Sequence, residues 1–133
     1  MKVFIVGAGP GNPELITVKG QRLLKEADVI IYAGSLVNPA LLDVAKKGAE
    51  IHNSASMTLP EVIDTITAAI KAGKMVVRLH TGDPAIYGAI QEQMDELKKR
   101  NIEFEVVPGV SSFLATAAAL KQEYTLPDIS QTV

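Results

Sequence analysis

The sequence predicts a single α/β domain with a five-stranded, mainly parallel sheet and helices on both faces. Several short segments, such as residues 3–6 and 29–31, are apolar at every position. These segments alternate with stretches of helical periodicity, and turns rich in glycine and proline follow them. Strands without an apolar-polar alternation are typical of parallel sheets that helices cover on both sides. A chain of 133 residues with 47% hydrophobic residues is long enough for one such core.

In the first half of the chain we expect two helices between short strands. The elements are a strand over residues 2–6, a helix over about 13–26, a strand over 29–32, a helix over about 39–47 and a short strand over 50–52. Leucine and valine at near-helical spacing predict the first helix. Asn38 and Pro39 start the second, because Asn caps helices well and Pro fits the first turn, and Gly48 ends it.

The second half continues the alternation after a polar loop over residues 53–58. The elements are a helix over 59–72, a strand over 75–79, a helix over 86–100, a strand over 104–107 and an alanine-rich helix over 110–120. The helix over 59–72 is amphipathic, with Val62, Ile66 and Ile70 on one face. Right-handed crossovers should connect the strands, and a ligand should lie beyond their carboxyl ends.

Composition excludes several classes of function. The net charge is −2 and aromatic residues make up 5%, which gives no support for nucleic-acid binding. The chain has no cysteine, so it forms neither disulfides nor thiolate metal sites. No apolar run is long enough to span a bilayer. We therefore expect a cytoplasmic protein with no membrane or nucleic-acid partner.

The loop over residues 7–15 is rich in glycine and follows the first strand. It does not match the dinucleotide fingerprint, because Asn12 stands where the third glycine belongs and the second strand ends without an acidic residue. It also lacks the Gly-Lys-Ser/Thr ending of a phosphate-binding loop, and Pro10 and Pro13 remove backbone donors. The loop therefore predicts a ligand that is neither a dinucleotide nor a triphosphate.

Four turns should meet at the carboxyl edge of the sheet. They span residues 7–12, 32–36, 80–84 and 108–112. Glycine, proline and small hydroxyl residues dominate them, with Asp83 as one carboxylate. No pair of carboxylates and no Ser/His/Asp set accompanies them. This pattern favours a site that positions a reactive cofactor over one that attacks with its own side chains.

Purely structural roles account for some of the same residues. Asp83 could be the N-cap of a helix with Pro84 in its first turn, and Ser111 or Ser112 could cap the last helix. His52 and His80 have no second ligand at metal spacing, so each is expected to be an ordinary, partly buried histidine with its hydrogen bonds satisfied. No metal site is expected.

Four motifs in series resemble the tetrapyrrole methylases that use S-adenosylmethionine. They read GAGPGNPELITVKG, ADVIIYAGSLV, RLHTGDPAIYGA and VVPGVSSFLATAAAL, in family order and over nearly the whole chain. Residues 32–37 and 53–59 look most like the subgroup that methylates C11 of precorrin-4 or cobalt-precorrin-4 in cobalamin synthesis. Uroporphyrinogen-III methylases instead have an aspartate at the position of Ala33 and a lysine near Ala55, and this chain has neither.

The resemblance implies residue roles. The positions that match cofactor contacts are Pro10, Thr81, Gly82, Asp83, Ile86, Ser111 and Ser112. The positions implied for the tetrapyrrole substrate are Gly9, Gly11, Tyr32, Ser35 and Met57. Arg78 is a weaker candidate for a carboxylate of the macrocycle, and no residue is assigned as the catalytic base. The product of the cofactor would be S-adenosylhomocysteine.

The family also has a second α/β domain after this one, with the cofactor in the cleft between them. Residues 1–133 would then be an N-terminal domain, whose partners are its own C-terminal domain and a second copy in a homodimer. Residues 128–133 resemble the start of the linker, and the isolated domain is expected to be inactive.

Three alternatives to this function remain. The chain could be another methylase of the superfamily, including the ribosomal-RNA ribose methylases. It could also be a non-catalytic module that binds an adenosine ligand, or a structural domain whose turns are only caps.

Overall fold

The computed structural model describes residues 2–128 and contains one sheet of five strands. The strands are β1 (Lys2–Gly7), β2 (Val29–Tyr32), β3 (Glu50–Asn53), β4 (Val76–His80) and β5 (Glu103–Val107). Their order is β3-β2-β4-β1-β5, and every neighbouring pair is parallel. The expected α/β fold is confirmed, with a sheet that is parallel throughout. Residues 129–133, which cover most of the expected linker, lie outside the described residues.

The described part of the chain has four α-helices and three short 3-10 helices, and all but the last α-helix, which follows β5, connect strands. The α-helices are α1 (Val18–Glu26), α2 (Leu59–Lys71), α3 (Ile90–Lys99) and α4 (Ser112–Ala119). The 3-10 helices are η1 (Pro13–Leu15), η2 (Pro39–Val44) and η3 (Ser54–Ser56). The bounds of α2 agree with the expected helix over 59–72 to within one residue.

In the first half of the chain, the predictions of two α-helices are wrong. The helix over 13–26 is interrupted, because Ile16 is extended and the Thr17 side chain caps a new helix by accepting a hydrogen bond from Gly20 N. The helix over 39–47 is a 3-10 helix that ends at Val44, although Asn38 caps it as expected.

The expected helices over 86–100 and 110–120 both begin too early. α3 starts only at Ile90, because Tyr87 and Ala89 adopt left-handed conformations with φ of 56° and 51°. α4 starts at Ser112 and ends at Ala119. The polar loop over 53–58 is also more regular than expected, since η3 forms within it.

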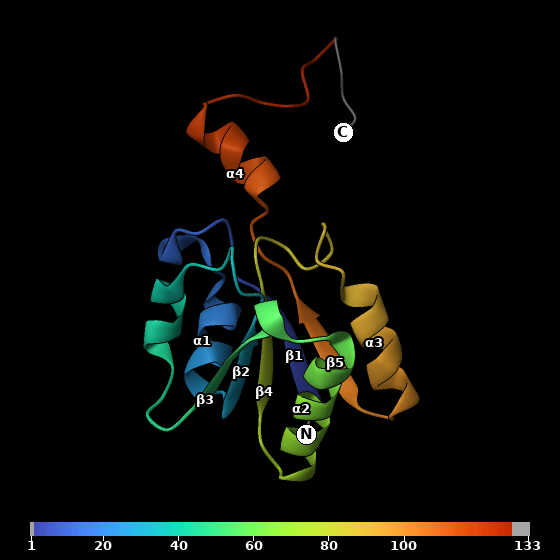
Figure 1. Ribbon diagram of the computed structural model, residues 1–133. Coiled ribbons are helices and arrows are strands. Elements are labelled where there is room, and N and C mark those ends of the chain that lie inside the picture. The colour runs from blue at the N-terminus through green and yellow to red at the C-terminus, as the bar shows by residue number, and fades with distance from the viewer. Residues whose placement is uncertain (1, 129–133) are drawn as a thin grey trace.

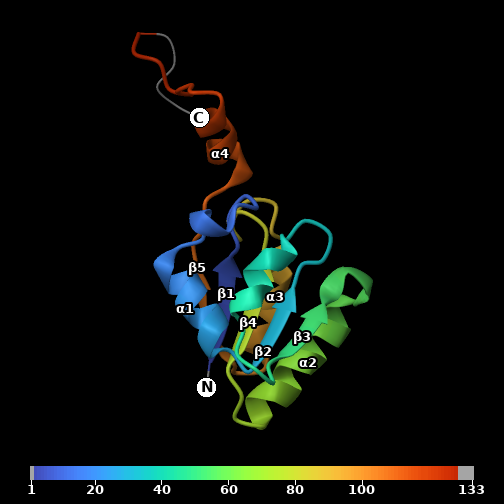
Figure 2. The same ribbon diagram turned by 90° about the vertical axis from the view of Figure 1, so that its left-hand side faces the viewer.

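The sheet lies between two layers of helices (Figures 1 and 2). Side chains of α1 and η2 pack against one face, where Ile30, Val77 and Leu79 are buried. Side chains of α2 and α3 pack against the other face, where Ile5 and Ile31 are buried. Alternate residues of the central strands point to opposite faces, so these strands must be apolar at nearly every position.

The central strands β1 and β4 send their connections to opposite faces. The chain leaves β1 for α1 on one face and leaves β4 for α3 on the other. Neighbouring strands whose loops diverge in this way form the usual ligand site of an open parallel sheet. α4 stands beyond the carboxyl ends of the strands, away from the two helical layers (Figure 1). Within residues 2–128, no helix has the length and apolar character needed to cross a membrane.

Candidate functional site

The loops after β1, β4 and β5 meet at the carboxyl edge of the sheet. Gly9 N donates to the Gly82 carbonyl at 3.2 Å, and Gly82 N donates to the Gly9 carbonyl at 2.8 Å. Both glycines have positive φ, which disfavours other residues here. A Cβ on Gly7 would lie 2.6 Å from the Gly82 carbonyl oxygen and 2.7 Å from Gly109 Cα. Glycine therefore allows these three loops to approach more closely than side chains would permit.

Asp83 links two of these loops through its carboxylate. Oδ1 accepts a hydrogen bond from Ala85 N at 2.8 Å, and Oδ2 accepts one from Gly109 N at 3.0 Å. The expectation that Asp83 is a helix N-cap is wrong, because α3 begins seven residues later, at Ile90, with Ala89 as its N-cap. Asp83 instead caps a turn and holds the start of the β5 loop.

The other residues implied for the cofactor lie along the same edge. Ser111 is buried, and its Oγ caps α4 by accepting a hydrogen bond from Phe113 N, as expected. A Cβ on Gly82 would be 3.6 Å from Ser111 Cα, so these two loops are in contact. Ser112 is exposed at the start of α4, and Ile86 is about half exposed in the β4 loop. Pro10 follows Gly9 in the β1 loop and is partly exposed.

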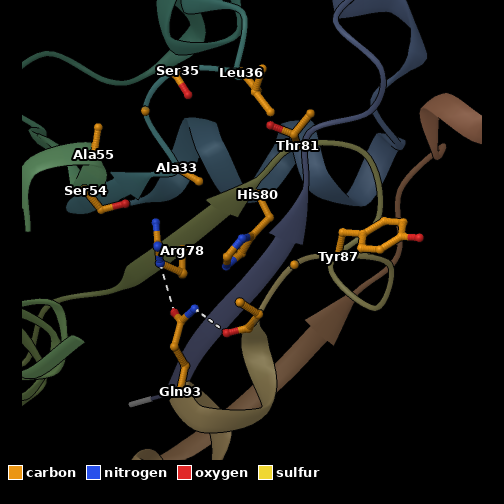
Figure 3. A pocket seen from close by; sticks show the side chains of 13 residues that line it. Ala33, Ser35, Leu36, Ser54, Ala55, Arg78, His80, Thr81, Tyr87 and Gln93 are labelled. Carbon is orange, nitrogen blue, oxygen red and sulfur yellow. Dashed lines mark hydrogen bonds between the residues drawn. The ribbon is translucent and has the colours of Figure 1, made fainter. Parts of the chain in front are cut away.

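Beside these loops, on the side of β2, lies an open pocket of about 410 Å³ (Figure 3). Its walls come from the loop after β2, from η3 and from the loop between β4 and α3. The lining residues include Ala33, Ser35, Ser54, Ala55, Arg78, His80, Thr81, Tyr87 and Gln93. None of the lining residues is Asp, Glu or Lys. The pocket is therefore a mostly small-residue cavity whose one permanent charge is positive.

The structure brings only some of the implied substrate residues to this pocket. Ser35 lines it, together with Thr81 from the cofactor set. Tyr32 packs against the core on the α1 face and Met57 against the core on the α2 face, and neither lines the pocket. Gly9 and Gly11 lie in the β1 loop, where the Gly11 carbonyl accepts a hydrogen bond from the Asn38 side chain at 2.8 Å.

Arg78 is a buried cation on the floor of the pocket. Its side chain reaches the Gln93 amide oxygen at 3.0 Å through Nε and the Ile31 carbonyl at 3.2 Å through one terminal nitrogen. Burial lowers the pKa of Arg78 to about 10, which leaves it charged at neutral pH. A guanidinium has five N–H donors, so donors remain for a ligand. A buried cation with no carboxylate beside it is costly unless an anion binds there.

His80 lies two residues further along β4 on the same face. Only 4% of the residue is exposed, and its Nε2 atom has no hydrogen-bond partner. The expectation of a satisfied, partly buried histidine is therefore wrong for His80. Burial and, secondarily, the charge of Arg78 lower the pKa of His80 to about 4, so its imidazole is neutral near pH 7. His52 lies elsewhere, on the edge strand β3; its Nε2 is 3.5 Å from a Glu50 carboxylate oxygen but likewise has no hydrogen-bond partner, so the expectation of satisfied hydrogen bonds is wrong for His52 too.

Sequence reasoning undervalued His80 and missed Gln93. A signal was present, because residues i and i+2 of a strand share a face and Arg78 and His80 directly precede the ligand loop. Gln93 gave no such signal, since it reaches Arg78 only through the placement of α3. Within residues 2–128, no three His, Asp or Glu side chains are grouped closely enough to hold a metal ion.

The sequence of this chain is similar to those of known tetrapyrrole methylases. Residues 2–133 match the sequence profile of the family described as Tetrapyrrole (Corrin/Porphyrin) Methylases. A cobalt-precorrin-4 C(11)-methyltransferase of Methanocaldococcus jannaschii is 65% identical over 132 residues, which is 99% of this chain and 51% of that protein.

Solved structures show the same relationship. The X-ray structure of a cobalt precorrin-4 methyltransferase has a TM-score of 0.96 and 54% identity, over 98% of this chain and 55% of that one. A uroporphyrin-III C-methyl transferase from Thermus thermophilus, complexed with S-adenosylhomocysteine, has a TM-score of 0.82 and 35% identity, over 99% of this chain and 53% of that one. The chain thus spans about half the length of the relatives it matches. It belongs to the tetrapyrrole (corrin/porphyrin) methylase family.

Proposed function

We propose that this chain is the N-terminal domain of an S-adenosylmethionine-dependent methyltransferase that acts on C11 of precorrin-4 or cobalt-precorrin-4 in cobalamin biosynthesis. The observation that carries the proposal is the 65% identity over 132 residues to a cobalt-precorrin-4 C(11)-methyltransferase. The absence of an aspartate at Ala33 and of a lysine near Ala55 supports the same subgroup over the uroporphyrinogen-III methylases. Both alanines line the pocket, so the difference lies where a substrate would bind.

The residues at the carboxyl edge fit S-adenosylmethionine. The close approach of Gly7, Gly82 and Gly109 brings the three loops together without side chains between them. We assign Pro10, Thr81, Gly82, Asp83, Ile86, Ser111 and Ser112 to its binding. The cofactor supplies a methyl group that is already activated by a sulfonium. The protein then has to align the acceptor carbon with the methyl group and exclude water.

The pocket on the β2 side fits one edge of a tetrapyrrole. The macrocycle carries carboxylate side chains, and Arg78 offers a buried cation without a carboxylate among the pocket residues. The fork of N–H donors on arginine suits a carboxylate. Small residues such as Ala33, Ser35 and Ala55 leave room for a planar ring system. We therefore assign Arg78 and Ser35 to the substrate, whereas Tyr32 and Met57 lie outside this pocket.

A second domain and a second copy of the chain complete the proposed enzyme. α4 and the segment after it expose Phe113, Leu114 and Leu120 to 43%, 57% and 61%. Apolar surface of this extent on a projecting helix indicates a protein partner. The relatives are about twice as long as this chain, so the partner that we assign is the C-terminal domain, within a homodimer. Residues 1–133 alone are then expected to be inactive.

The test is transfer of a labelled methyl group by the longest reading frame that contains these residues. Precorrin-4, cobalt-precorrin-4 and uroporphyrinogen III are offered separately with methyl-labelled S-adenosylmethionine. Label on either precorrin-4 species supports the proposal and identifies which of the two is used. Label on uroporphyrinogen III alone would assign the chain to another branch of the family. Tight S-adenosylhomocysteine binding without any transfer would favour the non-catalytic module.

A further inference from the structure

Gln93 is a buried amide that contacts the cation of the pocket. It lies in the first turn of α3, and 6% of the residue is exposed, the same fraction as for Arg78. Its amide oxygen accepts a hydrogen bond from Arg78 Nε at 3.0 Å, and its amide nitrogen donates to the Ala89 carbonyl at 3.3 Å (Figure 3). Since Nε can only donate and a carbonyl can only accept, these two partners fix which end of the amide faces the guanidinium.

Both acceptors that hold the Arg78 guanidinium are electrically neutral. One is the Gln93 amide oxygen, and the other is the Ile31 carbonyl, which accepts from Nη1 at 3.2 Å. A carboxylate at either place would hold the same nitrogen and would also compensate its charge. The protein therefore fixes the orientation of the guanidinium and leaves its positive charge uncompensated among the residues of the pocket.

The second terminal nitrogen of Arg78, Nη2, is open to the pocket. Neither Gln93 nor Ile31 bonds to it. Within residues 2–128, the side-chain nitrogens that lack a partner and are closed to solvent belong to His52 and His80, and Arg78 Nη2 is not among them. Both N–H groups of Nη2 and one of Nη1 thus remain for a ligand.

We propose that Gln93 is a positioning residue, which holds Arg78 through a neutral amide so that the full charge of the guanidinium meets a carboxylate of the tetrapyrrole. This role rests on the proposed function, which supplies the carboxylate. Two N–H groups held in one orientation can bind both oxygens of a carboxylate, and such charge-assisted pairs are the stronger hydrogen bonds. Because the orientation exists before the substrate arrives, less conformational entropy is lost on binding.

The proposal explains why the side chain at position 93 is an amide and not an acid. A carboxylate there would form an internal ion pair with Arg78 and would compete with the substrate for it. Its second oxygen would also face the Ala89 carbonyl, where the Gln93 amide now donates. The amide satisfies both neighbours and adds no charge.

The experiment compares Q93E with Q93M in the longest reading frame that contains these residues. Q93E keeps an oxygen for Arg78 Nε and adds a negative charge, whereas Q93M has a similar length and makes neither hydrogen bond. We expect KM for the precorrin-4 species to rise at least about tenfold in Q93E and about two- to fivefold in Q93M, with kcat of both within about threefold. Q91E, the same change at an exposed position of α3, should leave KM unchanged.

The order of the two variants separates this role from a structural one. A glutamine that only supports the fold predicts the reverse order, because Q93E retains the bond to Arg78 and Q93M loses both bonds. In the R78M background, Q93M should raise KM no further, since Gln93 acts through Arg78. Calorimetric affinity for S-adenosylhomocysteine should be unchanged in all these variants, which verifies that they fold.

A second readout needs no methyl transfer. Uroporphyrin, an oxidised tetrapyrrole whose side chains end in carboxylates, is titrated with each protein, and its fluorescence reports binding. Its affinity should fall in Q93M and fall further in Q93E, and Q91E should bind it as the unaltered protein does.

Several results would overturn the proposal. They are a KM in Q93E within twofold of the unaltered value, a higher KM in Q93M than in Q93E, and an effect of Q93M that is equally large with and without Arg78. The last comparison decides the matter if Q93E does not fold. If the unaltered protein methylates neither precorrin-4 species, the proposed function fails; a lower uroporphyrin affinity in Q93E would still support the role of Gln93, and an equal affinity would refute it. Absence of both methyl transfer and uroporphyrin binding would refute both proposals.

Discussion

The carboxylate of Asp83 accepts a hydrogen bond from the backbone N–H of Gly109, 26 residues later in the chain, at 3.0 Å. The other carboxylate oxygen accepts from Ala85 N in its own loop. A single side chain thus couples the loop after β4 to the loop after β5, which are separated in the sheet by β1. These are the two loops that carry six of the seven residues assigned to the cofactor.

Replacing Asp83 should therefore affect ligand binding more than stability. D83A removes two hydrogen bonds to backbone N–H groups, and we expect the free energy of unfolding to fall by about 1–2 kcal/mol. Affinity for S-adenosylhomocysteine should fall at least tenfold, because the loops lose their coupling and the ligand loses a carboxylate. Calorimetry and urea unfolding of D83A measure the two effects, with D64A on the exposed face of α2 as the matched control. Loss of stability with unchanged affinity would leave Asp83 only a turn cap.

The close approach of Gly7, Gly82 and Gly109 makes a second prediction. In G109A the new methyl group would meet the Gly82 carbonyl oxygen, so the β4 and β5 loops would have to separate. We expect a loss of about 1–3 kcal/mol in stability and a large loss of S-adenosylhomocysteine affinity. The control is G48N, because Gly48 has open space around it and asparagine tolerates its positive φ. Wild-type affinity in G109A would contradict this account of the loops.

Replacing Arg78 should lower the affinity for the tetrapyrrole substrate more than it changes the stability of the fold. R78M removes a buried, uncompensated cation but leaves the buried Gln93 amide oxygen without its donor, so the two effects oppose each other and stability should change by less than about 3 kcal/mol. Affinity for the tetrapyrrole should fall at least tenfold, because a carboxylate loses its charged, forked partner. R78K should recover only part of that affinity, because lysine keeps the charge and loses the fork. Tetrapyrrole KM and thermal unfolding of the two variants provide the measurement, and an unchanged KM in R78M would remove Arg78 from the substrate site.

The buried imidazole of His80 makes stability depend on pH. Above pH 6.5 the group is neutral in both the folded and the unfolded chain. Between pH 6.5 and about 4 the unfolded chain binds a proton that the folded chain does not, so stability falls as the pH is lowered. The expected loss over this interval is about 3 kcal/mol. Urea unfolding at pH 7 and pH 4 should show it in the unaltered protein and a smaller loss in H80Q. Equal losses in both would mean that other groups dominate.

Much of the fold could be predicted because its signals are local. The apolar runs place β2 at residues 29–32, as the structure has it, and the amphipathic pattern places α2 to within one residue. The type of helix after β2 could not be predicted, because Asn38 and Pro39 begin a 3-10 helix as well as an α-helix. The late start of α3 could not be predicted either, since the residues with left-handed conformations are Tyr87 and Ala89 and not Gly88 between them.

The candidate site, too, could be predicted only in part from the sequence. Sequence reasoning placed Asp83 and Ser111 on a common edge, because the carboxyl ends of parallel strands converge there. It did not anticipate that His80 would be buried without a partner at Nε2, since burial depends on tertiary packing. The Arg78–Gln93 contact likewise depends on tertiary packing.

The most direct test of the account is the position of the transferred methyl group. The longest reading frame that contains these residues is incubated with [methyl-¹³C]S-adenosylmethionine and either precorrin-4 or cobalt-precorrin-4, and the product is analysed by ¹³C NMR. The account predicts one enriched methyl signal, coupled to C11 of the macrocycle. Enrichment at another ring carbon, or no enriched tetrapyrrole from either substrate, would contradict it.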